Sequence, residues 1–210
     1  MTELCEEGVD IVAKLMAVAA RTAPKTAGAD WVQIKLCKKE EKQHVAEMMI
    51  KVSERKAKMV ETDNKDRANA MRGDWKSDAR TVEQANTLLL IGIQGRKVAK
   101  LNCGGCGFSD CADMMKQKQL SLETTDFPGP FCMFRVMDLS IAVGSAVKIA
   151  MDLNVDNRMM QKVGIGALKL RLLSPCDLIL GIPLSATGKN IFFDRADKID
   201  AWKILSSKKK

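Results

Sequence analysis

Aromatic side chains and histidine are scarce in this sequence. Only 4% of its 210 residues are aromatic, tyrosine is absent, and His44 is the single histidine. Platforms that bind single-stranded nucleic acid stack bases on aromatic rings, so the composition argues against a nucleic-acid partner. His44 lies in a long polar stretch, where we expect it to be exposed to solvent. Catalysis by a serine–histidine or cysteine–histidine pair therefore has no support in the sequence.

Long apolar runs and a secretory signal are also missing. The first apolar stretch, residues 11–20, contains Lys14 and follows several acidic residues, whereas a secretory signal begins with basic ones. No run reaches the roughly 20 apolar residues that a bilayer-spanning helix needs. We therefore expect a cytoplasmic protein without a membrane partner.

The sequence does contain a cluster of cysteines. Four of its seven cysteines fall within one short segment, and an odd total cannot be fully paired in disulfides; the four are Cys103, Cys106, Cys111 and Cys132. Iron–sulfur clusters often take three thiolates from one tight loop and a fourth from further along the chain. Glycines between the first cysteines let such a loop wrap closely. The pattern predicts a 4Fe-4S cluster held by these four thiolates.

Zinc is the main alternative for the same cysteines, and a disulfide pair is another. Zinc sites usually combine two short C-x-x-C pairs, and here only Cys103 and Cys106 make one. The net charge of +8 is compatible with an acidic partner. It would also offset the charge of about −2 that a four-thiolate cluster carries. A cluster whose four ligands are all thiolates transfers single electrons and leaves no iron open to substrate.

The pattern along the chain predicts one α+β domain over residues 1–210, with residues 101–133 inserted as the iron–sulfur segment. Apolar spacing predicts helices over about 4–20, 40–60, 113–120, 139–151 and 159–173. Strands are predicted over 31–37, 87–93 and 176–182, the last of them ended by Pro183. Residues 61–80 are charged and weakly patterned, so we expect a loop and a surface helix there, and the most mobile part of the chain. Residues 152–158 read as a polar loop or helix start with Arg158 at the surface.

A second candidate site follows the last predicted strand. It offers hydroxyl and amine groups in the loop formed by Ser185, Thr187 and Lys189. Such a loop could hold a phosphate, although Pro183 and Asn190 break the P-loop pattern. A structured surface turn is the alternative interpretation. Positive charge could be added to an anion site by Arg21, Lys25 and Arg195.

The stretch 102–108 together with Cys111 resembles the compact 4Fe-4S ferredoxin-type module of corrinoid and electron-transport proteins. The whole chain resembles a prokaryotic family described only as uncharacterised proteins that contain a ferredoxin domain. The stretches that match are residues 20–25, 144–147, 155–158 and 181–189. That family name carries no established reaction, so the resemblance implies a cluster and leaves the substrate open.

The chain is also similar to the flavin-dependent nitroreductases, in residues 19–24, in the helix 139–153 and in the strand 178–183. This similarity implies a mixed sheet flanked by helices, a homodimer, and FMN bound at the dimer interface. The candidate cofactor-binding residues are Arg21, Pro24, Lys25, Ser185, Thr187 and Lys189. The arginine-rich stretch that holds the flavin phosphate in that superfamily is absent, and the loop after Pro24 lacks the expected asparagine.

Two functional hypotheses account for these features. In the first, an iron–sulfur redox protein passes single electrons to a flavin or a small substrate held near the loop at Pro24, the helix at Gly144 and the loop 185–189. In the second, the chain is a non-enzymatic electron-transfer or assembly subunit that binds no flavin and serves a redox partner protein. A zinc-stabilised adaptor is a third interpretation.

Overall fold

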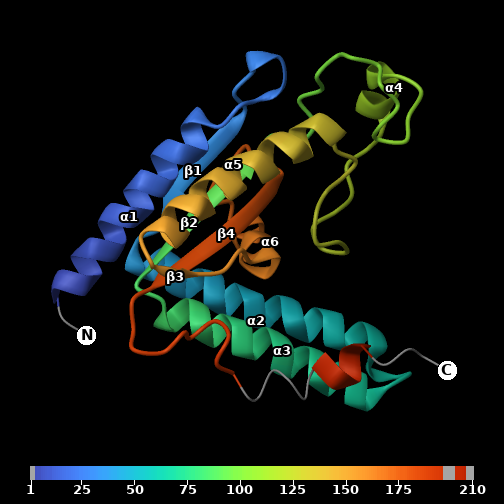
Figure 1. Ribbon diagram of the computed structural model, residues 1–210. Coiled ribbons are helices and arrows are strands. Elements are labelled where there is room, and N and C mark those ends of the chain that lie inside the picture. Colours follow the sequence, from blue (N-terminus) through green and yellow to red (C-terminus); the bar gives the residue numbers. More distant parts are fainter. Residues whose placement is uncertain (1–2, 196–201, 207–210) are drawn as a thin grey trace.

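The computed structural model describes residues 3–195 and 202–206 (Figure 1). Its helices are α1 (Glu3–Thr22), α2 (Lys39–Glu61), α3 (Lys65–Gln84), α4 (Cys111–Lys116), α5 (Met133–Asp152) and α6 (Gln161–Lys169), with a short 3-10 turn η1 (Thr26–Gly28). Its strands are β1 (Val32–Leu36), β2 (Thr87–Ile93), β3 (Asp156–Asn157) and β4 (Leu178–Ser185). The α+β class predicted from the sequence is confirmed.

The four strands form one sheet in the order β1-β2-β4-β3, and each of these neighbouring pairs is antiparallel. At the centre, Ile91 of β2 lies opposite Ile34 of β1 on one side and Leu180 of β4 on the other. The resemblance implied a mixed sheet, whereas the strand pairs in the described ranges run antiparallel throughout. Loops at one end of the sheet are therefore separated from loops at the other end by the full length of a strand.

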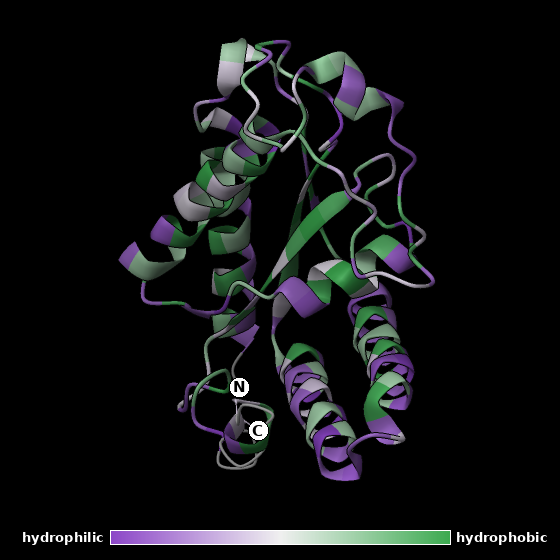
Figure 2. Cartoon of the chain, turned by 90° about the vertical axis from the view of Figure 1, so that its right-hand side faces the viewer, coloured by the Kyte–Doolittle hydropathy of each residue, from purple (hydrophilic) through white to green (hydrophobic). Residues whose placement is uncertain are grey.

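Helices cover both faces of the sheet. Side chains alternate along β2, so that Leu89 and Ile91 pack with α1 and α5, while Leu88 and Leu90 pack with α2 and α6. Figure 1 shows α1 and α5 side by side on one face, with α2 and α3 on the opposite side. Figure 2 shows hydrophobic colour on the strands and hydrophilic colour on the outer sides of α2 and α3. The apolar core is thus two layers, one on each face.

Two glycines allow α6 to lie directly on β4. A Cβ atom on Gly164 would be 1.8 Å from the backbone oxygen of Ile179. A Cβ atom on Gly181 would be 2.1 Å from Cγ1 of Val163. Because only glycine permits so close an approach, these positions fix the distance between helix and strand.

The segment 61–80 differs from the prediction. A loop with a surface helix was expected, but α3 is a continuous helix that packs closely along α2. Asn64 caps its start by accepting a hydrogen bond from the backbone N–H of Arg67 at 2.8 Å. Its inner face buries Trp75 together with the acidic residues Asp74 and Asp78, which pair with Lys162 of α6. The prediction was wrong because ion pairs with a distant helix allow charged residues to face the interior.

The last strand also runs further than predicted. β4 continues through Pro183 to Ser185, and Pro183 lies opposite Leu88 of β2. The backbone N–H of Gly181 points away from β2 and donates to the carbonyl of Met160. The nitrogen of Pro183, two residues later, faces the same side, where it costs no hydrogen bond to β2. Residues 156–157, expected in a polar loop or helix start, pair with the end of β4 as β3.

No helix in the described part of the chain is both long and apolar enough to cross a bilayer.

Candidate metal centre and neighbouring sites

The four clustered cysteines line a single small hollow. Cys103 and Cys106 lie in the loop after β2, Cys111 opens α4, and Cys132 immediately precedes α5. None of the four forms a disulfide; Cys103 is exposed, Cys106 and Cys111 are half-buried, and Cys132 is buried. The hollow encloses only about 10 Å³, which is about the room of one water molecule. A cluster would therefore displace the exposed side of the loop outwards, and that side faces solvent.

The cysteine loop is shaped by left-handed backbone conformations. Asn102, Gly104 and Gly107 have φ angles of 46°, 70° and 88°. The side chain of Asn102 accepts a hydrogen bond of 3.0 Å from the backbone N–H of Cys111. These turns fold the chain back on itself, so that the first three cysteines face the same hollow.

Gly95 joins the cysteine segment to the sheet. Its N–H donates to Oδ1 of Asp177 at 2.5 Å, and its carbonyl accepts from the backbone N–H of Cys132 at 2.8 Å. A Cβ atom at this position would lie 2.7 Å from Cδ1 of Phe131. Cys132 is thus held at the start of α5 by a short chain of hydrogen bonds that ends on Asp177, the residue before β4.

The donor set suits an iron–sulfur cluster. Across residues 3–195 and 202–206, no three histidine, cysteine or acidic side chains are close enough to share one metal ion. A four-iron cluster does not require this, because each thiolate binds a different iron. Thiolates are the ligands that such clusters use, and Asp110, which also lines the hollow, already accepts a hydrogen bond from the N–H of Asp113. The residues present therefore fit the predicted group.

Two other cysteines, Cys37 and Cys176, lie against the core beside the sheet. Burial raises the pKa of each thiol to about 12, so both stay protonated at neutral pH. They pack as small hydrophobic side chains, as the sequence predicted. Neither of them lines the hollow of the four clustered thiols.

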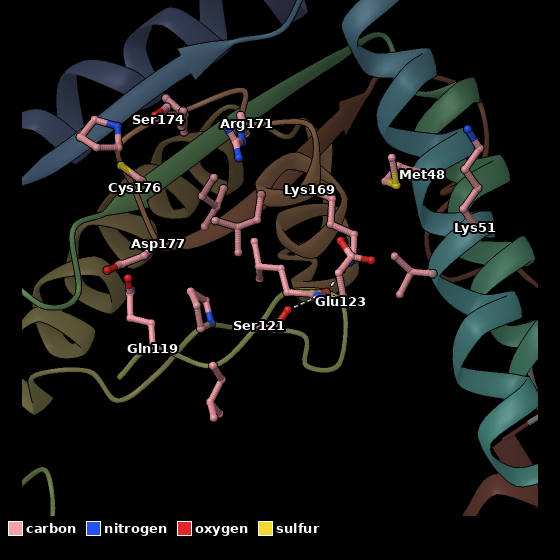
Figure 3. A pocket seen from close by; sticks show the side chains of 18 of the residues that line it. Met48, Lys51, Gln119, Ser121, Glu123, Lys169, Arg171, Ser174, Cys176 and Asp177 are labelled. Carbon is pink, nitrogen blue, oxygen red and sulfur yellow. Dashed lines mark hydrogen bonds between the residues drawn. The ribbon is translucent and has the colours of Figure 1, made fainter. Parts of the chain in front are cut away.

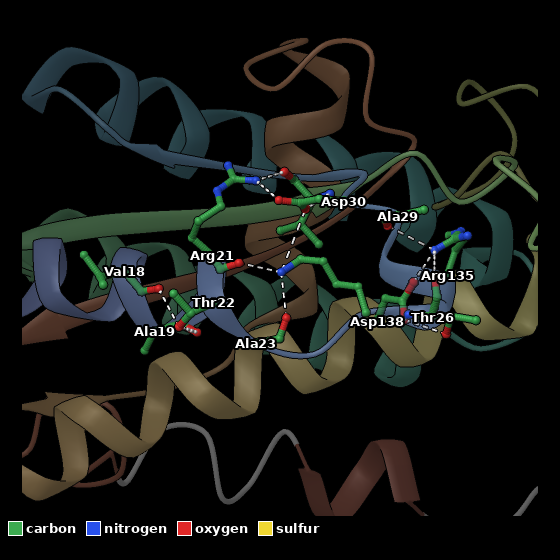
Figure 4. Close-up of polar contacts among 12 residues, drawn as sticks. Val18, Ala19, Arg21, Thr22, Ala23, Thr26, Ala29, Asp30, Arg135 and Asp138 are labelled. Atoms are coloured by element: carbon green, nitrogen blue, oxygen red, sulfur yellow. Dashed lines mark hydrogen bonds and ion pairs between the residues drawn. The ribbon is translucent and has the colours of Figure 1, made fainter.

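The loop at Pro24 is closed by its own polar contacts (Figure 4). Arg21 donates to Asp30 at 2.6 Å and to the carbonyl of Val32 at 2.9 Å. The amine of Lys25 is almost buried and donates to the carbonyls of Arg21 and Ala23. Both predicted phosphate-binding cations are therefore engaged within the chain, while Pro24 itself is exposed.

A buried ion pair behind this loop was missed by sequence analysis. Arg135 and Asp138 of α5 pair at 2.5 Å with side chains only 2% exposed. Asp138 also accepts from the backbone N–H and the hydroxyl of Thr26, both at 2.8 Å, while Nε of Arg135 donates to the carbonyl of Lys97. The pair ties the loop at Pro24 to the start of α5, close to Cys132. The signal was available: two opposite charges lie three residues apart on a helix that carries no other charge before Lys148.

The second predicted loop lies at the other end of the sheet. Ser185 is fully buried at the end of β4, and the hydroxyl of Thr187 donates to the carbonyl of Lys189 at 2.6 Å. Val32, next to the Pro24 loop, pairs with the last residue of β2, whereas Leu184 pairs with the first. Seven residues of strand separate them by about 20 Å. Within one chain, the structure does not bring the two groups of predicted cofactor-binding residues together.

Two further cations, Arg195 and Arg158, pair with a buried carboxylate of α3. Arg195, considered for an anion site, donates to Asp78 at 2.7 Å and its side chain is 7% exposed. Arg158, predicted as a surface residue, also pairs with Asp78 and stacks over the ring of Phe193. Arg158 is partly exposed, and its inner contact is to a buried carboxylate of α3 that the sequence pattern did not place there.

Comparison with solved structures shows the fold. A BluB-like flavoprotein from Clostridium difficile 630 matches with a TM-score of 0.60 and 16% identity, covering 86% of this chain and 82% of that one. Nitroreductase A from Vibrio parahaemolyticus matches with a TM-score of 0.49 and 11% identity, covering 86% of this chain and 59% of that one. The chain thus spans about three fifths of the length of that nitroreductase. The nitroreductase-like arrangement expected from the sequence is confirmed as a fold.

Comparison with protein sequences shows the family. An uncharacterized protein from Archaeoglobus fulgidus is 40% identical over 192 residues, which cover 91% of this chain and 94% of the relative. The profile of a family described as "Uncharacterized protein containing a ferredoxin domain (DUF2148)" matches residues 128–195, a range that includes Cys132. The chain therefore belongs to this family of proteins that contain a ferredoxin domain.

Proposed function

We propose that this protein is a cytoplasmic iron–sulfur redox protein that uses a 4Fe-4S cluster for single-electron transfer. The ligands would be Cys103, Cys106, Cys111 and Cys132. The observation that carries the proposal is the convergence of these four unpaired thiols on one hollow. Membership in a ferredoxin-domain family supports it. When bound, the cluster would supply one-electron redox chemistry.

The chain's own residues would hold the thiolates in place. The hydrogen bonds of Gly95 connect Cys132 to the sheet, and Asn102 fixes the backbone of Cys111. Cys132 also lies at the N-terminus of α5, a helix of 20 residues whose free N–H groups favour negative charge. These contacts would hold Cys132 and the backbone of Cys111 before metal binds, while the exposed side of the loop would move outwards to admit the cluster.

The electron acceptor is proposed to be FMN or a small substrate in a homodimer. The two groups of candidate flavin residues lie at opposite ends of the sheet, so one flavin could contact both only between two chains. A surface for pairing is available on α1 and α5, where apolar side chains are 41–60% exposed: Ile11, Leu15, Val18, Met137 and Ile141. Adjacent exposed apolar residues of this kind commonly mark an interface. The fold shared with a BluB-like flavoprotein supports the flavin.

A second candidate function is an electron-transfer or assembly subunit without flavin. The contacts of the Pro24 loop favour it, because Arg21 pairs with Asp30 and Lys25 is bound to two carbonyls. A flavin phosphate would have to break these contacts. In this reading the cluster serves a redox partner protein.

Anaerobic purification tests the proposal and separates the two candidates. We expect about four irons and four sulfides per chain. Stoichiometric FMN together with a dimeric mass would support the flavoenzyme, and iron without flavin would support the second candidate. Protein that carries zinc, or no iron after anaerobic purification, would contradict both.

A further inference from the structure

A large cavity lies beside the cysteine segment, away from both predicted flavin loops. It has a volume of about 850 Å³, within the roughly 300–1,000 Å³ typical of small-molecule sites. Three parts of the chain enclose it (Figure 3): the middle of α2, the connection after α6, and residues 119–128 between the third and fourth clustered cysteines. The last of these walls belongs to the proposed cluster-binding segment.

The floor of the cavity is apolar. It is made by side chains of the core beneath the sheet face, each less than 10% exposed: Val52, Leu168, Leu173, Cys176 and Ile179. Burying an apolar group against such a floor gains about 25 cal/mol for each Å² removed from water. The floor therefore suits the hydrocarbon or ring portion of a ligand.

The rim carries positive charge that the chain leaves largely unused. Within residues 3–195 and 202–206, Lys51 and Arg171 have neither a hydrogen bond nor an ion pair through their side chains. Lys169 donates to the carbonyl of Leu122, and burial lowers the pKa of its ammonium group. Glu123, which also lines the cavity, and Asp126 offset part of the charge of Lys169, and a bound anion would compensate the charge that remains at Lys51 and Arg171. Arg55, in contrast, pairs with Asp126, a carboxylate that it shares with Lys56.

The opposite end of the cavity is connected to the proposed cluster. Asp177 and Gln119 point toward one another there (Figure 3). Asp177 accepts from the N–H of Gly95, whose carbonyl accepts from the N–H of Cys132. A ligand in the cavity would thus contact Asp177, which is linked to Cys132 by hydrogen bonds through Gly95. It would also contact the segment that carries the cysteines.

We infer that this cavity binds a small organic anion, with its apolar body on the floor and its acid group toward Lys169 and Arg171, while Lys51 on the α2 wall adds positive charge to the rim. We assign the cavity as the site of the small-molecule redox substrate, and this assignment rests on the function proposed above. The substrate therefore need not lie at the flavin loops. A carboxylate, a sulfonate and a phosphate all meet this requirement, because all three pair with the same cations.

The test uses two fluorescent probes of similar shape and different charge. They are 8-anilino-1-naphthalenesulfonate, which is an anion, and N-phenyl-1-naphthylamine, which is neutral. In the anaerobically purified full chain, the double variant Arg171→Gln with Lys51→Gln should bind the sulfonate about tenfold more weakly, and the neutral probe within about twofold of wild type. The matched control, Lys14→Gln with Lys148→Gln, removes two exposed charges near the apolar face of α1 and α5 and should change neither affinity.

The outcomes separate this inference from the proposed function, because iron is measured in the same samples. Iron-loaded protein whose sulfonate affinity is equal in wild type and the cavity double variant would overturn the cavity assignment alone. The same holds if the control variant shows the larger loss, since binding would then be on α1 and α5. Protein that lacks iron but shows charge-dependent binding would overturn the proposed function while keeping the anion site.

Discussion

The sheet with its helices and the cysteine segment are stabilised in different ways. All seven residues of β2 are buried, whereas between residues 101 and 131 only Met114 and Pro128 are. The scaffold gains its stability from apolar burial on both faces of the sheet. The cysteine segment has one six-residue helix and a few hydrogen bonds. The difference indicates that the scaffold can fold alone, while the segment depends on what its cysteines bind.

The largest effect is expected where helix and strand touch in the scaffold. Gly164→Ala would place a methyl group 1.8 Å from the carbonyl oxygen of Ile179, and backbone cannot move aside cheaply. We expect a loss of more than about 4 kcal/mol, enough to prevent folding. Far-UV circular dichroism and denaturant titration measure it.

Gly144→Ala is the matched control. It lies in α5 with open space around it, so alanine should change stability by no more than about 1 kcal/mol, and in the stabilising direction. Equal losses in the two variants would show that close contact between α6 and β4 does not hold the scaffold together.

Removal of iron should affect only the cysteine segment. After chelation, we expect trypsin to cut at Lys116 or Lys118 about tenfold faster, because opening of this segment would no longer be opposed by metal binding. The unfolding transition of the scaffold should stay within about 1 kcal/mol of that of the loaded protein. A collapse of the whole transition on chelation would contradict the separation between the two regions.

A smaller effect is expected at Gly95, which joins the scaffold to the cysteine segment. Gly95→Ala brings a methyl group to 2.7 Å from the ring of Phe131, which can move only partly, so we expect a loss of about 1–3 kcal/mol. Iron content should fall as well, since Cys132 is bonded to this residue. Gly188→Ala, in open space on an exposed loop, is the control that should leave both quantities unchanged.

The smallest effect concerns the pH dependence of stability at the same joint. Burial raises the pKa of the Asp177 carboxyl, so the folded state holds this proton more tightly than the unfolded state. Wild-type stability is therefore lost as the pH rises through the folded-state pKa. Asp177→Asn cannot ionise, and its amide oxygen can still accept from Gly95. Relative to wild type, the variant should gain stability as the pH rises above about 4, the usual pKa of a free aspartate; a difference that stays constant with pH would contradict the assigned shift.

The same contrast explains how much could be predicted from the sequence. The range of β2 was predicted to the residue, because a continuous apolar run fixes a buried strand. The four clustered cysteines were identified by spacing, and the structure brings them to one hollow. Both signals are local and depend on few distant partners.

What could not be predicted depends on contacts between distant segments. The inner face of α3 contains Asp74 and Asp78, whose partner Lys162 is more than eighty residues away in the chain. The position of the Ser185 loop at the far end of the sheet follows from strand register. The large cavity has walls from three segments, none of which shows a motif. The local sequence pattern carries no information on contacts between segments that are distant in the chain.

The most direct test of the central claim is the iron content of cysteine variants purified without oxygen. Cys106→Ser removes one proposed ligand, and Cys5→Ser removes an exposed cysteine outside the hollow. We expect wild type and Cys5→Ser to carry about four irons per chain, and Cys106→Ser to carry less than about half of that. Equal iron in Cys106→Ser and Cys5→Ser would contradict the assignment of the four cysteines as ligands.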